Sequence, residues 1–514
     1  MGQHDVKNGQ DASAIRRFTR HIMQDMRALD YMLSEKMFET DIQRIGAEQE
    51  LFLIDDHFQP SSLAEEVLAL SDNERLVNEL TRFNLEINLD PLELTGDCFS
   101  AMQRSLDDLV NYARGLSDQV GAQIVLAGIL PTIHAWDLRL ENMAPKARYF
   151  TLNDTIMGLK GGKAQYHIRG VDELFFQHDN IMVEGCNTSF QVHFQVTPDT
   201  FAHYYNIAQL ISGPVLASAA NSPVLFGKRL WRETRIALFQ QAVDTRSSNL
   251  YLREMSPRVH FGTDWVNESV TEIFQEDIAR FRVIMTSDYE DPFEVLERGE
   301  VPKLKALQLH NGTVYRWNRA CYGISGDKPH LRIENRLLPA GPSTVDEMAN
   351  TALWAGLMQG LALDHSDIRP LMDFDDAKSN FISVARRGLA SELDWIDGKR
   401  WGAGELIVQQ LVDIARKGLK ARKVDEEDIE RYLGIIDARV KSQLTGAQWQ
   451  LSSLASMRRQ GSNTRADRLD SLVENMVKWQ KTGLPGHEWS LAEIRPKAFN
   501  TILGTRVEHF MSTD

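Results

Sequence analysis

The stretch Arg44-Ile-Gly-Ala-Glu-Gln-Glu-Leu-Phe-Leu-Ile54 alternates in chemical character along its length, which predicts a β-strand. On such a strand Glu48 and Glu50 lie on one face, about 7 Å apart, because residues two positions apart point the same way. Ala47 and Leu51 lie on the opposite face. The strand is therefore expected to have one apolar face and one face that carries two carboxylates.

Three further segments repeat this pattern of one apolar face and one face of polar or charged side chains, which we call the selected face. In residues 83–90 the selected face holds Asn84, Glu86, Asn88 and Asp90. In residues 188–196 it holds Gln191, His193 and Gln195, and in residues 330–337 it holds Arg332, Glu334 and Arg336. A single strand of this kind is explained by an antiparallel sheet with one face in water. Together, however, these faces contain no Lys and almost no Thr or Ser, in which solvated strands are usually rich. The four strands are therefore predicted to line a ligand cavity.

The acidic residues of these faces indicate a divalent metal. Convergence of Glu48, Glu50, Glu86 and Glu334 would force protons onto some of the carboxylates at neutral pH unless cations lay between them. An oxygen-rich site with one imidazole, here His193, suits Mg²⁺ or alternatively Mn²⁺ better than Zn²⁺. Because Mg²⁺ is typically held by a few carboxylates together with substrate phosphates, ATP follows as a hypothesis for the cofactor.

Arginines near the same strands supply the positive charge that this hypothesis needs. Guanidinium groups bind phosphate and carboxylate in bidentate fashion, so they would balance a transferring phosphate or hold a substrate carboxylate. The candidates are Arg316, Arg319, Arg332 and Arg336.

Composition limits the remaining possibilities. The 514 residues suggest two to four structural units at about 150 residues per domain. With 57 Lys and Arg against 72 Asp and Glu, the net charge of −15 argues against nucleic acid or a membrane surface as the main partner. The three cysteines show no CxxC spacing, and no apolar run has the length of a signal peptide or a membrane span. We expect a cytoplasmic protein that acts on small-molecule substrates. Assembly into a homo-oligomer is compatible with these features.

Three regions of the chain differ in their hydrophobic pattern, and these patterns predict its domain organisation. Residues 1–43 contain apolar side chains at steps of three and four, which predicts an N-terminal amphipathic helix. Residues 44–374 mix alternating segments with helical ones and predict an α+β catalytic domain. Helical periodicity dominates residues 375–514, so we expect an all-helical C-terminal extension there.

Several segments resemble those of the glutamate-cysteine ligases, in particular the second, bacterial and plant-like group of carboxylate-amine ligases. The matching residues are Gly46-Ala-Glu48-Gln-Glu50-Leu, Leu85-Glu86-Ile-Asn, Gln191-Val-His193, Asn221-Ser222-Pro223 with Gly227, and Glu334-Asn-Arg336. The resemblance covers roughly residues 44 to 370, and the order of its motifs is more specific than any one of them. It implies a glutamine-synthetase-like fold, in which a curved antiparallel sheet flanked by helices forms a funnel for ATP, metal and amino acid.

The resemblance also implies roles for individual acidic residues. Glu50 and Glu86 resemble a first metal site. Glu48, His193 and Glu334 resemble a second metal site at the phosphate end of the funnel. Glu79 and Glu93 are rival candidates for the remaining carboxylate of the first site, and the motifs leave this choice open.

Further roles concern the arginines and one glutamine. Arg336 matches the arginine expected to stabilise a transferring phosphoryl group. Arg316 and Arg319 precede the same strand as candidate substrate contacts, and the spacing does not rank them. Gln191 and Arg332, on the selected faces, are expected to bind the nucleotide.

The resemblance predicts an ATP-dependent carboxylate-amine ligase of the kind used in glutathione biosynthesis. It would join the side-chain carboxylate of glutamate to an amine, with cysteine as the first guess, through an acyl phosphate and with release of ADP and phosphate. One alternative is a guanidino kinase, which would phosphorylate a nitrogen and stop. The other is a non-catalytic regulatory protein that retains the ligase fold.

Overall fold

An eight-stranded antiparallel sheet forms the centre of the computed structural model, which describes residues 7–8, 12–246, 257–461 and 463–495. The four predicted strands are immediate neighbours within the strand order β15-β16-β9-β2-β4-β3, and β5 and β6 pair with β2. The strands are β2 (Arg44–Ile54), β3 (Leu76–Asn78), β4 (Asn84–Asn88), β5 (Leu92–Glu93), β6 (Gln123–Val125), β9 (Phe190–Val196), β15 (Asn318–Ser325) and β16 (Lys328–Asn335).

The register of this sheet aligns the selected faces. Glu50 on β2 is paired with Glu86 on β4. Across the sheet, Glu334 on β16 is paired with His193 on β9 and with Arg319 on β15. Because directly paired residues of neighbouring strands share a face, the acidic and basic groups form one continuous polar surface.

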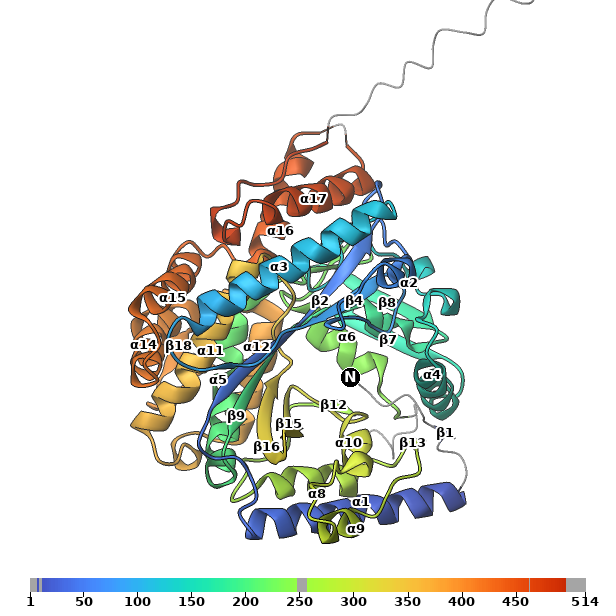
Figure 1. Cartoon of the computed structure of the whole chain (residues 1–514). Helices are drawn as coiled ribbons and strands as arrows, with labels where there is room; N and C mark the ends of the chain where they lie inside the picture. The colour runs from blue at the N-terminus through green and yellow to red at the C-terminus, as the bar shows by residue number, and fades with distance from the viewer. Residues whose placement is uncertain (1–6, 9–11, 247–256, 462, 496–514) are drawn as a thin grey trace, which may run out of the picture.

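The apolar face of the sheet packs against three long helices, α3 (Cys98–Gln119), α5 (Phe201–Ala219) and α11 (Thr344–Asp364). Figure 1 shows them together on one side of the curved sheet. Strand residues on that face, such as Leu51 and Ile333, are fully buried. Each such side chain stabilises the fold by about 1.5–3 kcal/mol relative to an exposed position.

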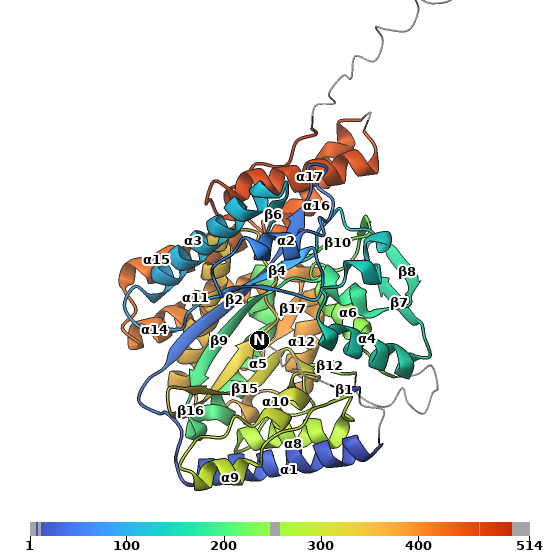
Figure 2. The same ribbon diagram turned by 45° about the vertical axis from the view of Figure 1, so that its right-hand side comes forward.

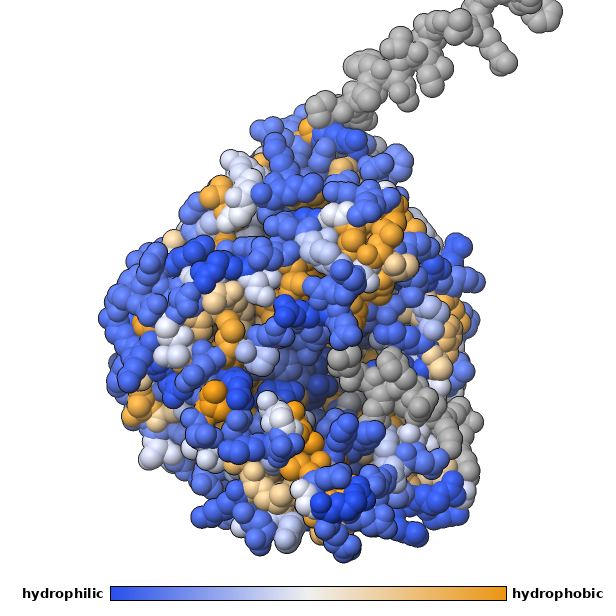
Figure 3. All heavy atoms as spheres, viewed as in Figure 1, coloured by the Kyte–Doolittle hydropathy of each residue, from blue (hydrophilic) through white to orange (hydrophobic). Residues whose placement is uncertain are grey.

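The opposite, polar face is framed by two groups of elements, as Figure 2 shows. One group consists of the amphipathic helix α1 (Ala12–Ser34), which the apolar periodicity predicts, with α8 (Val270–Arg280), α9 (Pro292–Glu297) and α10 (Lys305–Asn311). The other consists of α4 (Ala147–Lys160), α6 (Thr234–Ala242) and the hairpin β7 (Ala164–Arg169) and β8 (Glu173–His178). Between the groups the surface is hollowed and mostly hydrophilic (Figure 3).

Between residues 375 and 495, leaving out residue 462, the described chain is helical apart from connecting loops and one antiparallel hairpin, which corrects our expectation of helices alone. Its strands, β17 (Glu392–Asp394) and β18 (Arg400–Gly402), have only three residues each, too few for alternation to be recognised. The sequence signal for this hairpin is the pair Asp397-Gly398 in the connecting turn, because Asp-Gly favours tight hairpin turns. Gly398 adopts a φ of 72°, which suits glycine.

The helices of this region pack on α5, α11 and β6 or on one another. They are α12 (Phe374–Arg387), α13 (Ala403–Leu406), α14 (Val412–Ala421), α15 (Glu426–Lys441), α16 (Gly446–Arg459) and α17 (Arg465–Gln480). At the contact of α11 with α14, a Cβ on Gly360 would lie 2.1 Å from the carbonyl oxygen of Ile414. On α15, the buried Arg439 donates to Asp346 of α11 at 2.7 Å. The domain division at residue 374 stays a prediction.

Short elements complete the described structure. They are α2 (Ala64–Ala69), β1 (Lys7–Asn8) paired with β13 (Met285–Thr286), β10 (Val224–Leu225) paired with β11 (Lys228–Arg229), and β12 (Val259–His260) paired with β14 (Tyr315–Arg316). Within the described ranges, none of the helices has both the length and the apolar character required to cross a membrane.

Candidate active site

Three carboxylates meet on the polar face, and we call them the carboxylate cluster. Glu50 on β2, Glu86 on β4 and Glu79 after β3 each bring one oxygen atom within 4.8 Å of the others. Glu50 accepts hydrogen bonds from the Ser189 backbone N–H at 2.7 Å and the Gln191 amide at 2.8 Å. These bonds orient one carboxylate, but they bring no positive charge to the cluster.

Burial and mutual repulsion make the carboxylate cluster hold protons unusually tightly. Burial, and then the neighbouring Glu86 charge, raise the pKa of Glu50 to about 7. Burial, and then the Glu50 charge, raise the pKa of Glu79 to about 7, and the pKa of Glu86 lies well above its ordinary value. A divalent cation would remove this repulsion, and an all-oxygen donor set fits Mg²⁺ or Mn²⁺.

Glu79, not Glu93, joins Glu50 and Glu86. Glu93 is exposed on β5, where its register partner is Arg44. Glu79 lies in the loop between β3 and β4, and its own side chain accepts a hydrogen bond from the Leu80 backbone N–H at 3.0 Å. The motifs leave the choice between Glu79 and Glu93 open. The loop before β4 places Glu79, and not Glu93, beside Glu50 and Glu86.

Glu334 lies at the other side of the polar face and has protein cations on both carboxylate oxygens. Arg319 pairs with one oxygen at 2.7 Å, and the Cys321 thiol donates to that same oxygen at 3.0 Å. Arg336 pairs with the other oxygen. We call these four residues the Glu334 cluster. Burial would raise the pKa of the fully buried Glu334, but the two guanidinium groups outweigh it and hold the pKa well below its ordinary value.

Glu48 and His193 lie between the two clusters. The His193 ring nitrogen Nε2 is 3.1 Å from a Glu48 oxygen. Burial would raise the pKa of Glu48, yet the charge and hydrogen bond of His193 lower it overall. Glu48, His193 and Glu334 thus share one face, and each already has a protein partner, so their role as metal ligands stays a prediction.

Arg316 is not brought to this face. It lies on β14, outside the main sheet, and its guanidinium donates to Asp277 and Glu276 of α8 at 2.7 Å each. Only 3% of its side chain is exposed. Arg332 is on β16 two positions before Glu334, on the same face but nearer the start of the strand. Of the two arginines that spacing does not rank, Arg319 is the one that reaches Glu334 on the polar face.

A model of glutamate-cysteine ligase family 2 matches residues 44–474. The chain belongs to this family. It is therefore an ATP-dependent carboxylate-amine ligase, an enzyme that forms a carbon–nitrogen bond. This confirms the family resemblance drawn from the five matching segments.

One solved ligase structure agrees with this chain in fold. A glutamate–cysteine ligase from Francisella tularensis in complex with AMP has 12% identity and a TM-score of 0.54, covering 87% of this chain and 90% of that one. Its likeness confirms the α+β fold with a curved antiparallel sheet flanked by helices. A bifunctional glutathione synthetase from Pasteurella multocida has 12% identity and a TM-score of 0.44, covering 89% of this chain and 54% of that one. A comparison with curated proteins gives no match.

A small cleft in this ligase adjoins both clusters, and we call it the Glu184 pocket. Its enclosed volume is about 30 Å³, and its lining residues are Glu50, Glu184, Asn187, Ser189, Arg235, Phe239, Trp317 and Arg336. Sequence reasoning missed Glu184, which stands alone as an acid in the apolar run Ile181-Met-Val-Glu-Gly-Cys186. That isolation among buried neighbours is the signal that could have identified it.

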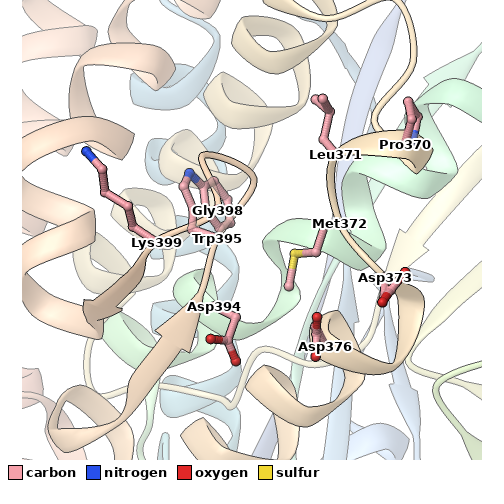
Figure 4. Close-up of a pocket in the computed structure, with 9 residues that line it drawn as sticks. All are labelled: Pro370, Leu371, Met372, Asp373, Asp376, Asp394, Trp395, Gly398 and Lys399. Atoms are coloured by element: carbon pink, nitrogen blue, oxygen red, sulfur yellow. The ribbon is translucent and has the colours of Figure 1, made fainter.

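A larger pocket, of about 340 Å³, lies elsewhere on the surface (Figure 4). It is formed between the start of α12 and the β17–β18 hairpin and includes Asp373, Asp376, Asp394 and Trp395. It shares no residue with either cluster. Size alone therefore does not locate the ligase chemistry.

Proposed function

We propose that this ligase joins the side-chain carboxylate of glutamate to an amine, with cysteine as the first candidate, through an acyl phosphate. The observation that carries the proposal is the juxtaposition of the carboxylate cluster with Arg336. Arg336 and Glu50 line one cleft, so a guanidinium and a site for a divalent cation face the same space. That pairing suits a phosphoryl group in transfer, whose charge is spread over its outer oxygens.

The reaction has two steps. A carboxylate oxygen of glutamate attacks the γ-phosphorus of ATP, the bond from that phosphorus to the bridging oxygen breaks, and ADP leaves. The amine nitrogen then attacks the acyl carbon, phosphate leaves with the carboxylate oxygen, and the nitrogen loses a proton. Throughout, the protein mainly positions the reactants and balances charge.

Mg²⁺ or Mn²⁺ would be held by Glu50, Glu79 and Glu86, and when bound would neutralise negative charge on the ATP phosphates. The raised pKa values of these groups support this assignment, because no ion pair with a described lysine or arginine balances their charge. Glu48, His193 and Glu334 are proposed for a second such site.

Arg336 is proposed to stabilise the transferring phosphoryl group, and Arg319 to assist it. Glu334 holds both guanidinium groups, which keeps them oriented toward the polar face before substrate arrives. Gln191 fixes the orientation of Glu50 through its 2.8 Å hydrogen bond. Contact of Gln191 and Arg332 with the nucleotide stays a prediction.

The proposal is tested by offering the protein Mg-ATP with pooled amino acids and amines. Mass spectrometry should detect a product with the mass of acid plus amine less one water, together with ADP in equal amount. Omission of glutamate and addition of a chelator are the controls, and each should abolish the product. A phosphorylated guanidine would indicate a guanidino kinase instead, and absence of any ATP turnover would indicate a non-catalytic protein.

A further inference from the structure

The Glu184 pocket contains an acidic group that the proposed chemistry does not use. Glu184 belongs to the short 3-10 helix Ile181–Cys186, whose other residues are all buried. Among the residues that the structure describes, its carboxylate has no hydrogen bond and no ion-pair partner within 4.0 Å. It is also outside the group of three carboxylates that could share a metal.

The charges around Glu184 make an empty pocket unfavourable. Glu50 of the carboxylate cluster repels it, while Arg336, already paired with Glu334, is the cation that attracts it. Both guanidinium groups of the lining already have a carboxylate partner, Arg336 in Glu334 and Arg235 in Glu233 at 2.9 Å. An anion entering the pocket would therefore still meet the carboxylates of Glu50 and Glu184. A cation of small size would be attracted by both.

The other walls favour an organic cation. Phe239 lies with its ring centroid 5.1 Å from Tyr315 and 5.8 Å from Trp317, so aromatic rings gather at one side of the pocket. Aromatic faces attract ammonium groups through their quadrupole. Asn187 offers a buried amide whose nitrogen and oxygen have no partner among the described residues. The volume of about 30 Å³ matches one water-sized group such as an ammonium head.

We propose that Glu184 binds an ammonium group of a substrate in this pocket. The inference rests on the proposed ligase reaction, in which both reactants offer such a group: the α-ammonium of glutamate and the protonated acceptor amine. If the group is the α-ammonium of glutamate, the side-chain carboxylate extends toward Arg336 and the carboxylate cluster, where the acyl phosphate would form. If it is the acceptor ammonium, its nitrogen gives one proton to Glu184 before it attacks the acyl carbon from the pocket. Arg235, part of the same lining, is 3% exposed and donates to Glu233 at 2.9 Å and to the Leu337 carbonyl at 2.8 Å.

The test uses Glu184→Gln, which keeps the shape of the side chain and removes its charge. Two acids, glutamate and glutarate, are each combined with two acceptors, cysteine and the largely uncharged hydroxylamine. Loss of one charge-assisted hydrogen bond should raise the affected KM by about 10- to 100-fold. If the acceptor ammonium binds at Glu184, the KM for cysteine rises and that for hydroxylamine does not. If the α-ammonium binds there, the KM for glutamate rises with both acceptors, and that for glutarate does not.

Asp179→Asn is the matched control, since it removes the same charge from an exposed position just before the helix. It should change none of these constants. Calorimetric titration of the full chain with glutamate, glutarate and cysteine gives a readout without turnover. If wild-type protein makes amide and Glu184→Gln leaves every KM and affinity unchanged, the inference is overturned while the proposed function stands. Wild-type protein that makes no amide rejects the proposed function, and the titrations then decide on Glu184 separately.

Discussion

The carboxylate cluster and the Glu334 cluster lie on the same face of one sheet, and they solve the problem of buried negative charge in opposite ways. Glu334 has two guanidinium groups on its carboxylate, so its pKa is low and its charge is balanced. Glu50, Glu79 and Glu86 form no ion pair within 4.0 Å with any arginine or lysine in the described part of the chain, and their pKa values are raised. One cluster has its charge balanced within the protein, and for the other we propose a divalent cation from outside. The charge of the neighbouring side chains thus distinguishes a glutamate that is proposed to bind a metal from one that holds arginine side chains in place.

Removal of one charge from the carboxylate cluster should have the largest effect. Glu86→Gln should lower kcat by roughly 10³-fold or more, because several kcal/mol of metal-derived charge stabilisation is lost. Steady-state ADP release at saturating Mg-ATP measures it. Glu93→Gln removes the same charge from the exposed rival position and should be near wild type. Equal activity of the two variants would place the metal elsewhere.

A change in the Glu334 cluster should cost less. Arg336→Lys keeps one positive charge but loses the planar fork, so kcat should fall by about 10²-fold or more, as for one lost transition-state donor. Binding of ATP and glutamate, followed by fluorescence titration, should weaken less than turnover. A variant whose KM rises while kcat is kept would make Arg336 a ground-state contact only.

The two clusters should also give opposite dependence of stability on pH. In Glu50 and Glu79 the folded-state pKa of about 7 exceeds the ordinary 4.5, so the folded protein binds more protons between these values and loses stability as pH rises from 4.5 to 7. Glu334, with a lowered pKa, loses stability only as pH falls below 4.5.

Thermal melts check this difference. Chelated protein should melt lower at pH 8 than at pH 5.5, and added Mg²⁺ should raise Tm more at pH 8. Glu79→Gln should reduce both effects. An Mg²⁺ shift of equal size at the two pH values would mean that the cation does not replace protons on this cluster.

The smallest effect on turnover is expected from Arg316, whose charge lies apart from both clusters. Arg316→Lys weakens its paired contact with Asp277, so stability should fall by about 1–3 kcal/mol. The kcat of the folded fraction should stay within about twofold of wild type, as measured below the melting range. A large loss of kcat with normal Tm would return Arg316 to the substrate contacts.

The sequence predicts the sheet and most of its polar face because strand alternation fixes which side chains share a surface. Glu50 and Glu86 converge because β2 and β4 pair in the register that their apolar residues require. Glu79 and Glu184 lie on a loop and a 3-10 helix, where no fixed period relates position to direction. Arg316 and Arg319 are only three residues apart, yet β14 pairs with β12 while β15 joins the main sheet. Arg316 and Arg319 therefore lie in different places because their strands pair with different partners, which the spacing in the sequence does not reveal.

The acyl phosphate is tested most directly by isotope transfer. Glutamate labelled with oxygen-18 in its side-chain carboxylate is turned over with unlabelled ATP and amine, and the released phosphate is analysed by mass spectrometry. Each phosphate should carry one labelled oxygen, ADP should be the only nucleotide product, and hydroxylamine should trap a hydroxamate at the same carboxyl group. Unlabelled phosphate under productive turnover, or AMP with pyrophosphate, would contradict phosphoryl transfer to the carboxylate.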